Sequence, residues 1–342
     1  MDSRAAYLPN PLQAVELSLT RFVERLPWLG GDLQTLRNFL QPRQVDLSPF
    51  GVERVVLPLD AETGDRAIGS LHRPLEPRPG RPLALLIHGL NGDEDSHYMR
   101  VTSAHLLQAG FPVLRLNLRG AGQSRPFCRA RYHAGRSEDL GRAIASLPPH
   151  LAADGVVAIG FSLGGNLLLK YLGEAERATP LVAAASVSAP IDLLATAHRI
   201  MAPRNALYHW YFLHYCQADI AGAGGTVTEE ERRASAAARS LWEFDERVTA
   251  PRHGFAGAAD YYTRTSARNF LDGIAVPTLL IQAEDDPIVP AEPYRDQRWQ
   301  RNRRLLPAVE RKGGHVGFHD RRGGTWHDRT IQAFFERVLS LS

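Results

Sequence analysis

The chain has 342 residues, of which 44% are hydrophobic and 23% charged, and its net charge is +3. These values are typical of a globular protein that dissolves in water, and they exclude a disordered or collagen-like chain. The small net charge does not favour a nucleic-acid-binding protein, so we expect no nucleic-acid partner.

The cysteine count and the N-terminal sequence indicate a cellular compartment. Two cysteines, Cys128 and Cys216, offer neither a disulfide framework nor the spacing of a metal site. The N-terminus lacks the pattern of a secretion signal, and no apolar run is long enough to span a membrane. We therefore expect free thiols and a cytoplasmic location.

Residues 1–50 are expected to form a helical extension that packs on the rest of the chain. Within it, residues 11–26 carry apolar side chains at helical spacing, which predicts an amphipathic helix. A helix packed on the core is the favoured interpretation, and a weak peripheral membrane contact is the alternative.

From residue 51 the chain alternates strand-like and helix-like segments. This alternation predicts an α/β fold with a mostly parallel sheet and helices on both faces. The expected strands are residues 52–57, 66–73, 83–87, 111–116, 156–159 and 181–187, and the expected helices are residues 97–109, 137–147 and 166–172.

Residues 193–265 interrupt this alternation with a helix-prone stretch rich in alanine, arginine and aromatic side chains. The β-α pattern then resumes with strands at residues 276–281 and 304–309 and a final helix at 328–339. We interpret residues 193–265 as a helical cap, because ligands of such sheets bind where the strands end. An ordinary helical core is the alternative. The sheet-forming core would then comprise residues 51–192 and 266–342.

The most informative motif surrounds one serine. Ser162 lies between Gly160 and Gly164, after the apolar run 156–159 and before the helix-like run 166–172. A nucleophilic serine on a sharp strand-to-helix turn needs small residues at these positions, since larger side chains would collide with the adjacent strand or helix. The spacing therefore predicts a nucleophile elbow.

A serine nucleophile needs a histidine base and an acid that orients it, and in proteins with an elbow serine both follow the serine in the chain. The acid candidates are Glu284, Asp285 and Asp286, directly after a predicted strand. We favour Asp286, since it lies deepest in the loop and beside Pro287, and we keep Asp285 as the alternative.

The base candidate is His315, whose glycine neighbours leave the imidazole free to reach the serine. His319 is the main rival. His319 and Asp320 could suggest metal ligands, but no further ligands stand at a recognisable spacing, so we expect no metal. The glycine-rich turn 117–124 matches neither a dinucleotide-binding nor a P-loop motif. We therefore expect no cofactor and assign Arg119 in this turn to holding neighbouring loops.

Attack on a carbonyl also requires donors for the oxyanion. One is expected to be the amide of Leu163, directly after the nucleophile, and the other the amide of Leu90, in the glycine-containing loop after the strand at 83–87. His88 is interpreted as a structural residue that holds this loop.

Together these motifs resemble the α/β-hydrolase fold superfamily, and within it the YheT-like esterases and their relatives, the ABHD1/ABHD3-type lipases. The resemblance implies that Ser162 is the nucleophile, Asp286 the acid and His315 the base. It also implies hydrolysis of short-chain or lipid-derived carboxylic esters. The segments that carry it are residues 31–35, 88–92, 119–120, 160–166, 244–245, 261–262, 285–287 and 313–315.

The expected function is therefore that of a serine esterase acting on a small-molecule ester through an acyl-enzyme. Acyl transfer to an alcohol with the same three residues is one alternative. A binding protein that retains the fold without turnover is another, although such a protein has no need of all three groups. The oligomeric state and the acyl chain length are left open.

Overall fold

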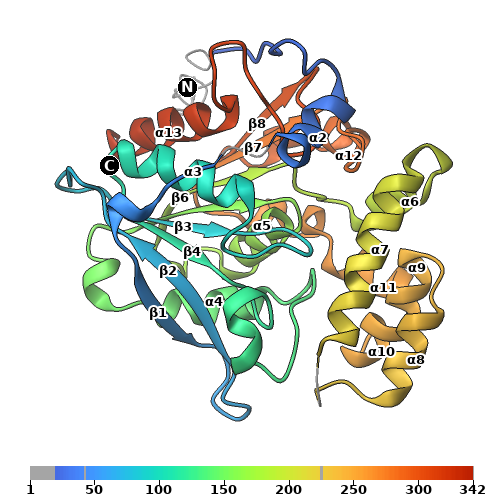
Figure 1. Ribbon diagram of the computed structural model, residues 1–342. Coiled ribbons are helices and arrows are strands. Elements are labelled where there is room, and N and C mark those ends of the chain that lie inside the picture. The colour runs from blue at the N-terminus through green and yellow to red at the C-terminus, as the bar shows by residue number, and fades with distance from the viewer. Residues whose placement is uncertain (1–19, 42–43, 224–225, 342) are drawn as a thin grey trace, which may run out of the picture.

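The computed structural model describes residues 20–41, 44–223 and 226–341. One eight-stranded sheet runs through the molecule, with helices on both faces (Figure 1). Its strand order is β1-β2-β4-β3-β5-β6-β7-β8, and all pairs from β4 to β8 are parallel, whereas β2 is antiparallel to both its neighbours. The strands are β1 Glu53–Pro58, β2 Arg66–His72, β3 Leu83–Ile87, β4 Val113–Leu116, β5 Val156–Phe161, β6 Leu181–Val187, β7 Thr278–Ala283 and β8 Leu305–Glu310.

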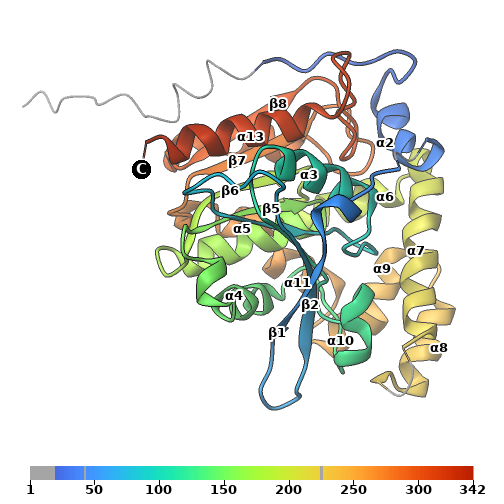
Figure 2. The same ribbon diagram turned by 60° about the vertical axis from the view of Figure 1, so that its left-hand side comes forward.

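The central strands are continuous apolar runs because both of their faces are covered. Successive side chains of a strand point to opposite faces. Leu85 accordingly packs in the core beneath α4 (Ser137–Ala145) and α5 (Leu163–Ala175), and its neighbour Leu86 packs in the core beneath α3 and α13. The bounds of the last two helices are His97–Gln108 for α3 and Trp326–Leu339 for α13. Figure 2 shows α3 and α13 on one side of the sheet and α4 and α5 on the other.

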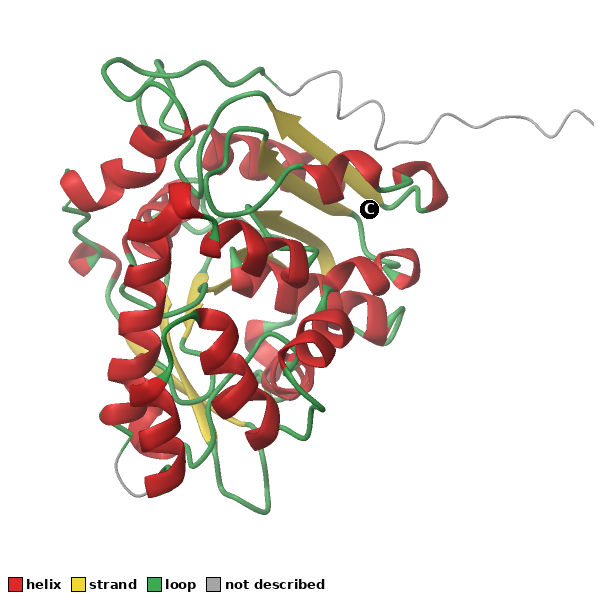
Figure 3. Cartoon of the chain, turned by 90° about the vertical axis from the view of Figure 1, so that its right-hand side faces the viewer, coloured by secondary structure: helices red, strands yellow, loops and turns green. Residues whose placement is uncertain are grey.

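A group of helices is inserted between β6 and β7. It lies beside the sheet, at the right of Figure 1, and faces the viewer in Figure 3. The group consists of α6 Leu193–Met201, α7 Ala206–Ala221, α8 Glu229–Ala237, α9 Leu241–Phe244, a π-helical turn Asp245–Thr249, α10 Ala250–Arg252 and α11 Ala258–Thr265. Two further helices are α2 Gly31–Leu40, before the sheet, and α12 Glu292–Asp296, after β7. None of the described helices is both long and apolar enough to cross a membrane.

The expected α/β fold and all eight strands are confirmed, with small shifts at the strand ends. The strand expected at 111–116 begins at Val113, and the one expected at 276–281 begins at Thr278. In both cases a proline precedes the first strand residue, and a proline cannot donate to the sheet.

The amphipathic helix predicted over residues 11–26 is not found in the part of that segment that the structure describes. Residues 11–19 lie outside the described residues, and residues 20–26 form no helix, so for that part the prediction was wrong. Tertiary contacts override the helical spacing there. Phe22 packs edge-on against Phe318 and Trp326, with ring centroids 5.6 and 6.2 Å apart, and Glu24 forms an isolated β-bridge with Asp320.

Arg119 joins three segments on one side of the sheet, as expected from its glycine-rich turn. Its guanidinium donates two hydrogen bonds of 2.6 Å to the carboxylate of Asp139 on α4 and another to Asp65 in the turn before β2. The Arg119 side chain is fully buried. A buried charge is tolerated only when it is paired in this way.

Arg119→Ala should therefore lower the free energy of unfolding by about 3–5 kcal/mol, because the buried carboxylate of Asp65 loses its cation and that of Asp139 keeps only Arg136. Urea titration followed by circular dichroism measures the change. The matched control is Arg233→Ala, which removes the exposed pair with Glu229 on α8 and should cost less than about 0.5 kcal/mol. Equal losses in the two variants would contradict this role of Arg119.

Candidate active site

Ser162 lies on a sharp turn between β5 and α5, with a φ of 50° that few residues other than glycine adopt. The turn is possible because glycines stand at the two positions where backbone segments approach most closely. A Cβ on Gly160 would lie 2.5 Å from the carbonyl oxygen of Gly164, and one on Gly164 would lie 2.3 Å from that of His88. The steric requirement predicted for the elbow is therefore present, and it presents the Ser162 hydroxyl at the carboxyl ends of the strands.

His315 lies in the loop between β8 and α13, and its imidazole reaches the serine. Its Nε2 lies 2.9 Å from Ser162 Oγ, and its Nδ1 lies 2.9 Å from Asp286 Oδ2. A carboxylate can only accept a hydrogen bond, so Nδ1 carries the proton and Nε2 is left to accept from the serine hydroxyl. The three groups thus form one hydrogen-bonded chain, in the arrangement that lets a histidine act as a general base.

Asp286 and Asp285 point in different directions. Asp286 is 1% exposed, and its Oδ1 accepts hydrogen bonds from the amides of Ile288 and Val289, at 2.8 and 2.9 Å. Asp285 instead accepts from the amide of Gly314 at 3.0 Å, and burial raises the pKa of its carboxyl. Glu284 pairs with Arg295 nearer the surface. Of the three acids, only Asp286 contacts the imidazole of His315.

The rival histidine lies elsewhere. His319 Nδ1 faces Arg37 at 3.4 Å, and Asp320 pairs with Arg329. Within residues 20–41, 44–223 and 226–341, no group of three or more His, Cys, Asp or Glu side chains is placed to hold a metal ion.

The loop that carries His315 is held by the N-terminal helix α2, a role that the sequence analysis did not assign. Thr35 Oγ1 accepts the amide of His315 at 2.8 Å, and Gln34 Oε1 accepts the amide of His319 at 2.7 Å. From the sheet side, Ser188 Oγ accepts the amide of Val316 at 3.0 Å. The only sequence signal was that Gln34 and Thr35 belong to the segment 31–35, which carries part of the family resemblance.

Helix α2 also contacts the inserted helices. Asp32 accepts hydrogen bonds from Tyr208 at 3.0 Å and from Arg204 at 2.6 Å, and the rings of Phe39 and Tyr211 meet edge-on at 5.6 Å. Helix α2 therefore links the histidine loop to α7.

The two expected oxyanion donors flank the serine. Leu163 begins α5, where backbone N–H groups have no partner within the helix and carry partial positive charge. Leu90 follows Gly89, whose Cβ, if present, would lie 3.0 Å from Ser162 Cβ. Among the described residues, neither the Leu90 amide nor the Leu163 amide donates to another backbone or side-chain group.

His88 supports the Leu90 loop from behind, as expected for a structural residue. Its Nε2 accepts the amide of Leu118 at 3.1 Å, and its Nδ1 lies 2.8 Å from the carbonyl oxygen of Gly89. Burial lowers the pKa of His88 to about 4, so the ring is neutral and can make both bonds at once.

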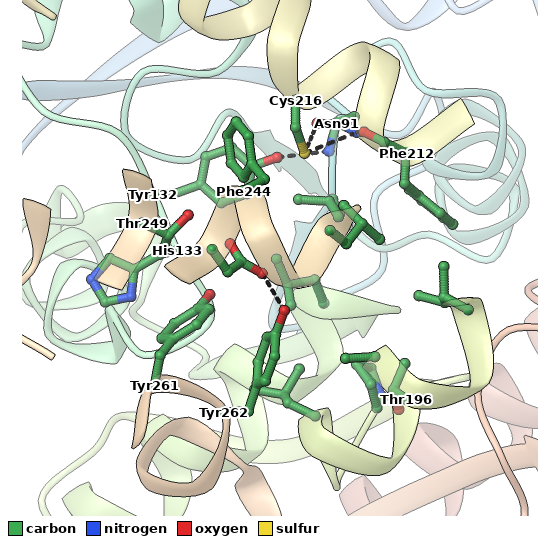
Figure 4. A pocket seen from close by; sticks show the side chains of 18 of the residues that line it. Asn91, Tyr132, His133, Thr196, Phe212, Cys216, Phe244, Thr249, Tyr261 and Tyr262 are labelled. Atoms are coloured by element: carbon green, nitrogen blue, oxygen red, sulfur yellow. Dashed lines mark hydrogen bonds between the residues drawn. The ribbon is translucent and has the colours of Figure 1, made fainter. Parts of the chain in front are cut away.

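A cleft opens above Ser162, between the sheet and the inserted helices. In Figure 4, Phe212 and Cys216 of α7 face Tyr261 and Tyr262 of α11 across it. Most of its lining is apolar; the aliphatic and phenylalanine side chains are Leu90, Leu163, Leu193, Ala197, Ile200, Phe212, Ile220, Leu241, Phe244, Val248, Ile288 and Val289.

Polar groups also line this cleft. Burial raises the pKa of Asp245 to about 6, although Thr249 and Tyr262 donate hydrogen bonds that act in the opposite direction. Burial lowers the pKa of His133 to about 2 and that of His253 to about 4, so both imidazoles are neutral.

The cleft's arginines are engaged in ion pairs. Arg131 pairs with Asp219, and Arg252 pairs with Glu231. The cleft therefore offers an apolar surface with a few polar positions and little net charge.

Comparison with known proteins agrees with this geometry. A family model described as "alpha/beta hydrolase fold" matches residues 82–321. The protein named "Putative esterase YheT" of Escherichia coli (strain K12) is 32% identical, over 88% of this chain and 88% of its own length. The "Medium-chain fatty acid ethyl ester synthase/esterase 2" of Saccharomyces cerevisiae is 29% identical over 76% of this chain, but the chain spans only 63% of that protein.

Among solved structures, the Pyrococcus furiosus esterase Pf2001 superimposes with a TM-score of 0.59 at 19% identity, over 85% of this chain and 92% of that one. At this sequence identity, the structural similarity is evidence for the fold alone. The family match covers more than half of the chain, and the similarity to YheT extends over nearly all of it. The chain thus belongs to the α/β-hydrolase fold family, in the group that includes YheT, and is a hydrolase.

Proposed function

We propose that the protein hydrolyses carboxylic esters through an acyl-enzyme formed on Ser162. The observation that carries this proposal is the hydrogen-bonded chain from Ser162 Oγ through His315 to Asp286, with both hydrogen bonds at 2.9 Å. A serine hydroxyl is a weak nucleophile until a base takes its proton, and His315 Nε2 is within reach to do so.

The reaction would run in two halves. Ser162 Oγ attacks the ester carbonyl while His315 takes its proton, and the amides of Leu90 and Leu163 stabilise the negative oxygen of the tetrahedral intermediate. His315 then protonates the leaving alcohol, and an acyl group stays on Ser162. Water, deprotonated by His315, attacks this acyl group, and His315 returns the proton to Ser162 Oγ as the acyl bond breaks and the acid product leaves. Asp286 holds the imidazole in the required tautomer and stabilises its positive charge.

The cleft supports an uncharged, largely apolar substrate, such as a short-chain or lipid-derived acyl ester. Its lining is mostly aliphatic and aromatic, and its arginines already pair with acids. In this proposal residues 193–265 act as a cap over Ser162, because α6, α7, α9 and α11 all contribute side chains to the cleft.

Acyl transfer to an alcohol is the second candidate. The same acyl-enzyme would be attacked by an alcohol in place of water, and the yeast relative is named as both a synthase and an esterase of ethyl esters. A binding role without turnover is less favoured, since it would not require the Ser162–His315–Asp286 chain.

A fluorophosphonate probe tests the nucleophile. The wild-type protein should be labelled at Ser162 and should hydrolyse p-nitrophenyl butyrate, because the probe reacts with serines activated by a neighbouring base. Ser162→Ala should lose both the label and the hydrolysis. A wild-type protein that is neither labelled nor active on short-chain acyl esters would refute the proposal.

The acid is tested with a matched pair of neighbouring residues. Asp286→Asn should lower kcat by about 10⁴-fold, because an amide cannot hold the imidazole in the same tautomer. Asp285→Asn keeps an oxygen for the Gly314 amide, so its kcat should stay within about threefold of wild type. A larger loss in Asp285→Asn than in Asp286→Asn would transfer the role of the acid to Asp285.

Asp245 makes the charge of the cleft depend on pH. Its raised pKa means that the carboxyl is neutral below about pH 6 and ionised above it. Covering the ionised form with an apolar acyl group costs solvation, so the wild-type KM for p-nitrophenyl butyrate should rise as pH increases through this value.

Asp245→Asn should remove this rise. The variant should bind the ester up to about tenfold more tightly than wild type at about pH 8 and equally well at about pH 5. Steady-state kinetics at the two pH values measures the difference. A KM ratio that is the same at both pH values would show that Asp245 does not face the bound acyl group.

A further inference from the structure

Two tyrosine hydroxyls hold the loop that carries Leu90. On one side, the amide of Gly89 donates to the hydroxyl of Tyr98, on α3, at 2.9 Å. On the other side, the amide of Asn91 donates to the hydroxyl of Tyr132 at 2.8 Å. The Tyr132 hydroxyl in turn donates to the carbonyl oxygen of Gly89 at 3.4 Å. Tyr132 therefore bridges the peptides before and after Leu90.

The amide of Leu90 differs from the neighbouring amides of the loop in its hydrogen bonding. Its neighbours donate to tyrosine oxygens, and the amide of Gly92 donates to the Gly89 carbonyl at 3.2 Å. Within the described parts of the chain, the Leu90 amide has no such acceptor. The hydrogen bonds thus set the orientation of the loop and keep one N–H group available beside Ser162.

One residue of this loop has a left-handed backbone conformation and a side chain that reaches the inserted helices. Asn91 has a φ of 57°, in the left-handed region, which asparagine tolerates better than most residues. Its side chain also reaches the inserted helix α7, where Nδ2 lies 3.4 Å from the carbonyl oxygen of Phe212 and 3.8 Å from Cys216 Sγ. Asn91 thus has contacts both within the loop, through its amide and Tyr132, and with the inserted helices, through its side chain.

Both hydroxyls are suited to this role because they stay neutral. Desolvation raises the pKa of Tyr98 to about 12 and raises that of Tyr132 further. A neutral phenol accepts an N–H bond through its oxygen and still donates its own proton, as Tyr132 does to Gly89. The Tyr132 ring also packs edge-on against His88, with centroids 5.5 Å apart, which fixes its position.

The geometry points to Tyr132 as a positioning residue for the oxyanion hole, with Tyr98 as its counterpart on the other side of the loop. Neither hydroxyl touches the reacting atoms in this inference. Each acts through the peptide of Leu90, whose N–H must meet the oxygen of the tetrahedral intermediate. The inference rests on the proposed function, since it presumes an oxyanion formed at Ser162.

The test compares Tyr132→Phe and Tyr98→Phe with Tyr171→Phe. The control removes a tyrosine hydroxyl that bonds Thr179 at 2.9 Å, at the far end of α5. For each variant, kcat and KM for p-nitrophenyl butyrate are measured together with the inhibition constant of a trifluoromethyl ketone. This inhibitor forms a hemiketal oxyanion with an active serine, so its affinity reports the oxyanion hole.

Tyr132→Phe should lower kcat by about tenfold, less than the loss on removing a donor outright, with KM within about twofold of wild type. The affinity for the ketone should fall by the same factor as kcat, because both depend on the oxyanion. Tyr98→Phe should also lower kcat and the affinity for the ketone. Tyr171→Phe should match the wild type in kcat, KM and the inhibition constant.

Unchanged kcat and ketone affinity in both Tyr132→Phe and Tyr98→Phe would overturn the inference while leaving the esterase proposal intact. A loss that appears in KM alone would also overturn it, since that result would place the hydroxyl against the bound ester. If Tyr132→Phe does not fold, Tyr98→Phe decides by the same criteria. A wild-type protein that neither turns over the ester nor binds the ketone would instead refute the proposed function itself.

Discussion

The close approach of three backbone segments at Gly160 and Gly164 is the constraint on which the site depends. The end of β3, the turn at Ser162 and the first turn of α5 lie so near one another that a single methyl group at either glycine would overlap a carbonyl oxygen. At this contact Ser162 has its positive φ, and the Leu90 loop lies beside it. The Ser162 hydroxyl and the amides of Leu90 and Leu163 are therefore neighbours because of backbone packing.

The sheet brings Asp286 and His315 to Ser162. Parallel strands end on the same edge, so the loops after β7 and β8 bring Asp286 and His315 to the serine although 124 and 153 residues separate them from it in the chain. Supports from outside the sheet then fix each loop. Thr35 and Gln34 of α2 hold the histidine loop, and Tyr98 and Tyr132 hold the Leu90 loop. Because α2 and Asn91 also contact α7, both loops are tied to the inserted helices.

The sequence predicted those features that depend on local pattern. Apolar runs, turn-rich separators and the strand-helix alternation identified all eight strands, and the glycine spacing around Ser162 indicated the turn. The choice among three neighbouring acids rested on loop position, and it agrees with the side-chain directions in the structure, where Asp286 meets the imidazole. The catalytic roles, the cap interpretation and the cytoplasmic location stay predictions.

Features set by tertiary contacts could not be predicted in this way. The spacing over residues 11–26 suggested a helix, but Phe22 packs against Phe318 and Trp326, which lie about 300 residues away, and residues 20–26 form no helix. The roles of Thr35 and Tyr132 depend on hydrogen bonds to distant backbone amides, for which a single sequence carries no spacing signal.

The most direct test of the account is to trap the acyl-enzyme. Wild-type protein would be mixed with p-nitrophenyl butyrate, quenched in acid during turnover and digested for peptide mass spectrometry. The Cys216 thiol also lines the cleft, so the site of acylation discriminates between it and the Ser162 hydroxyl. We expect a butyryl group on Ser162 at up to one per chain. Turnover with an unmodified Ser162, or with the acyl group on Cys216, would contradict it.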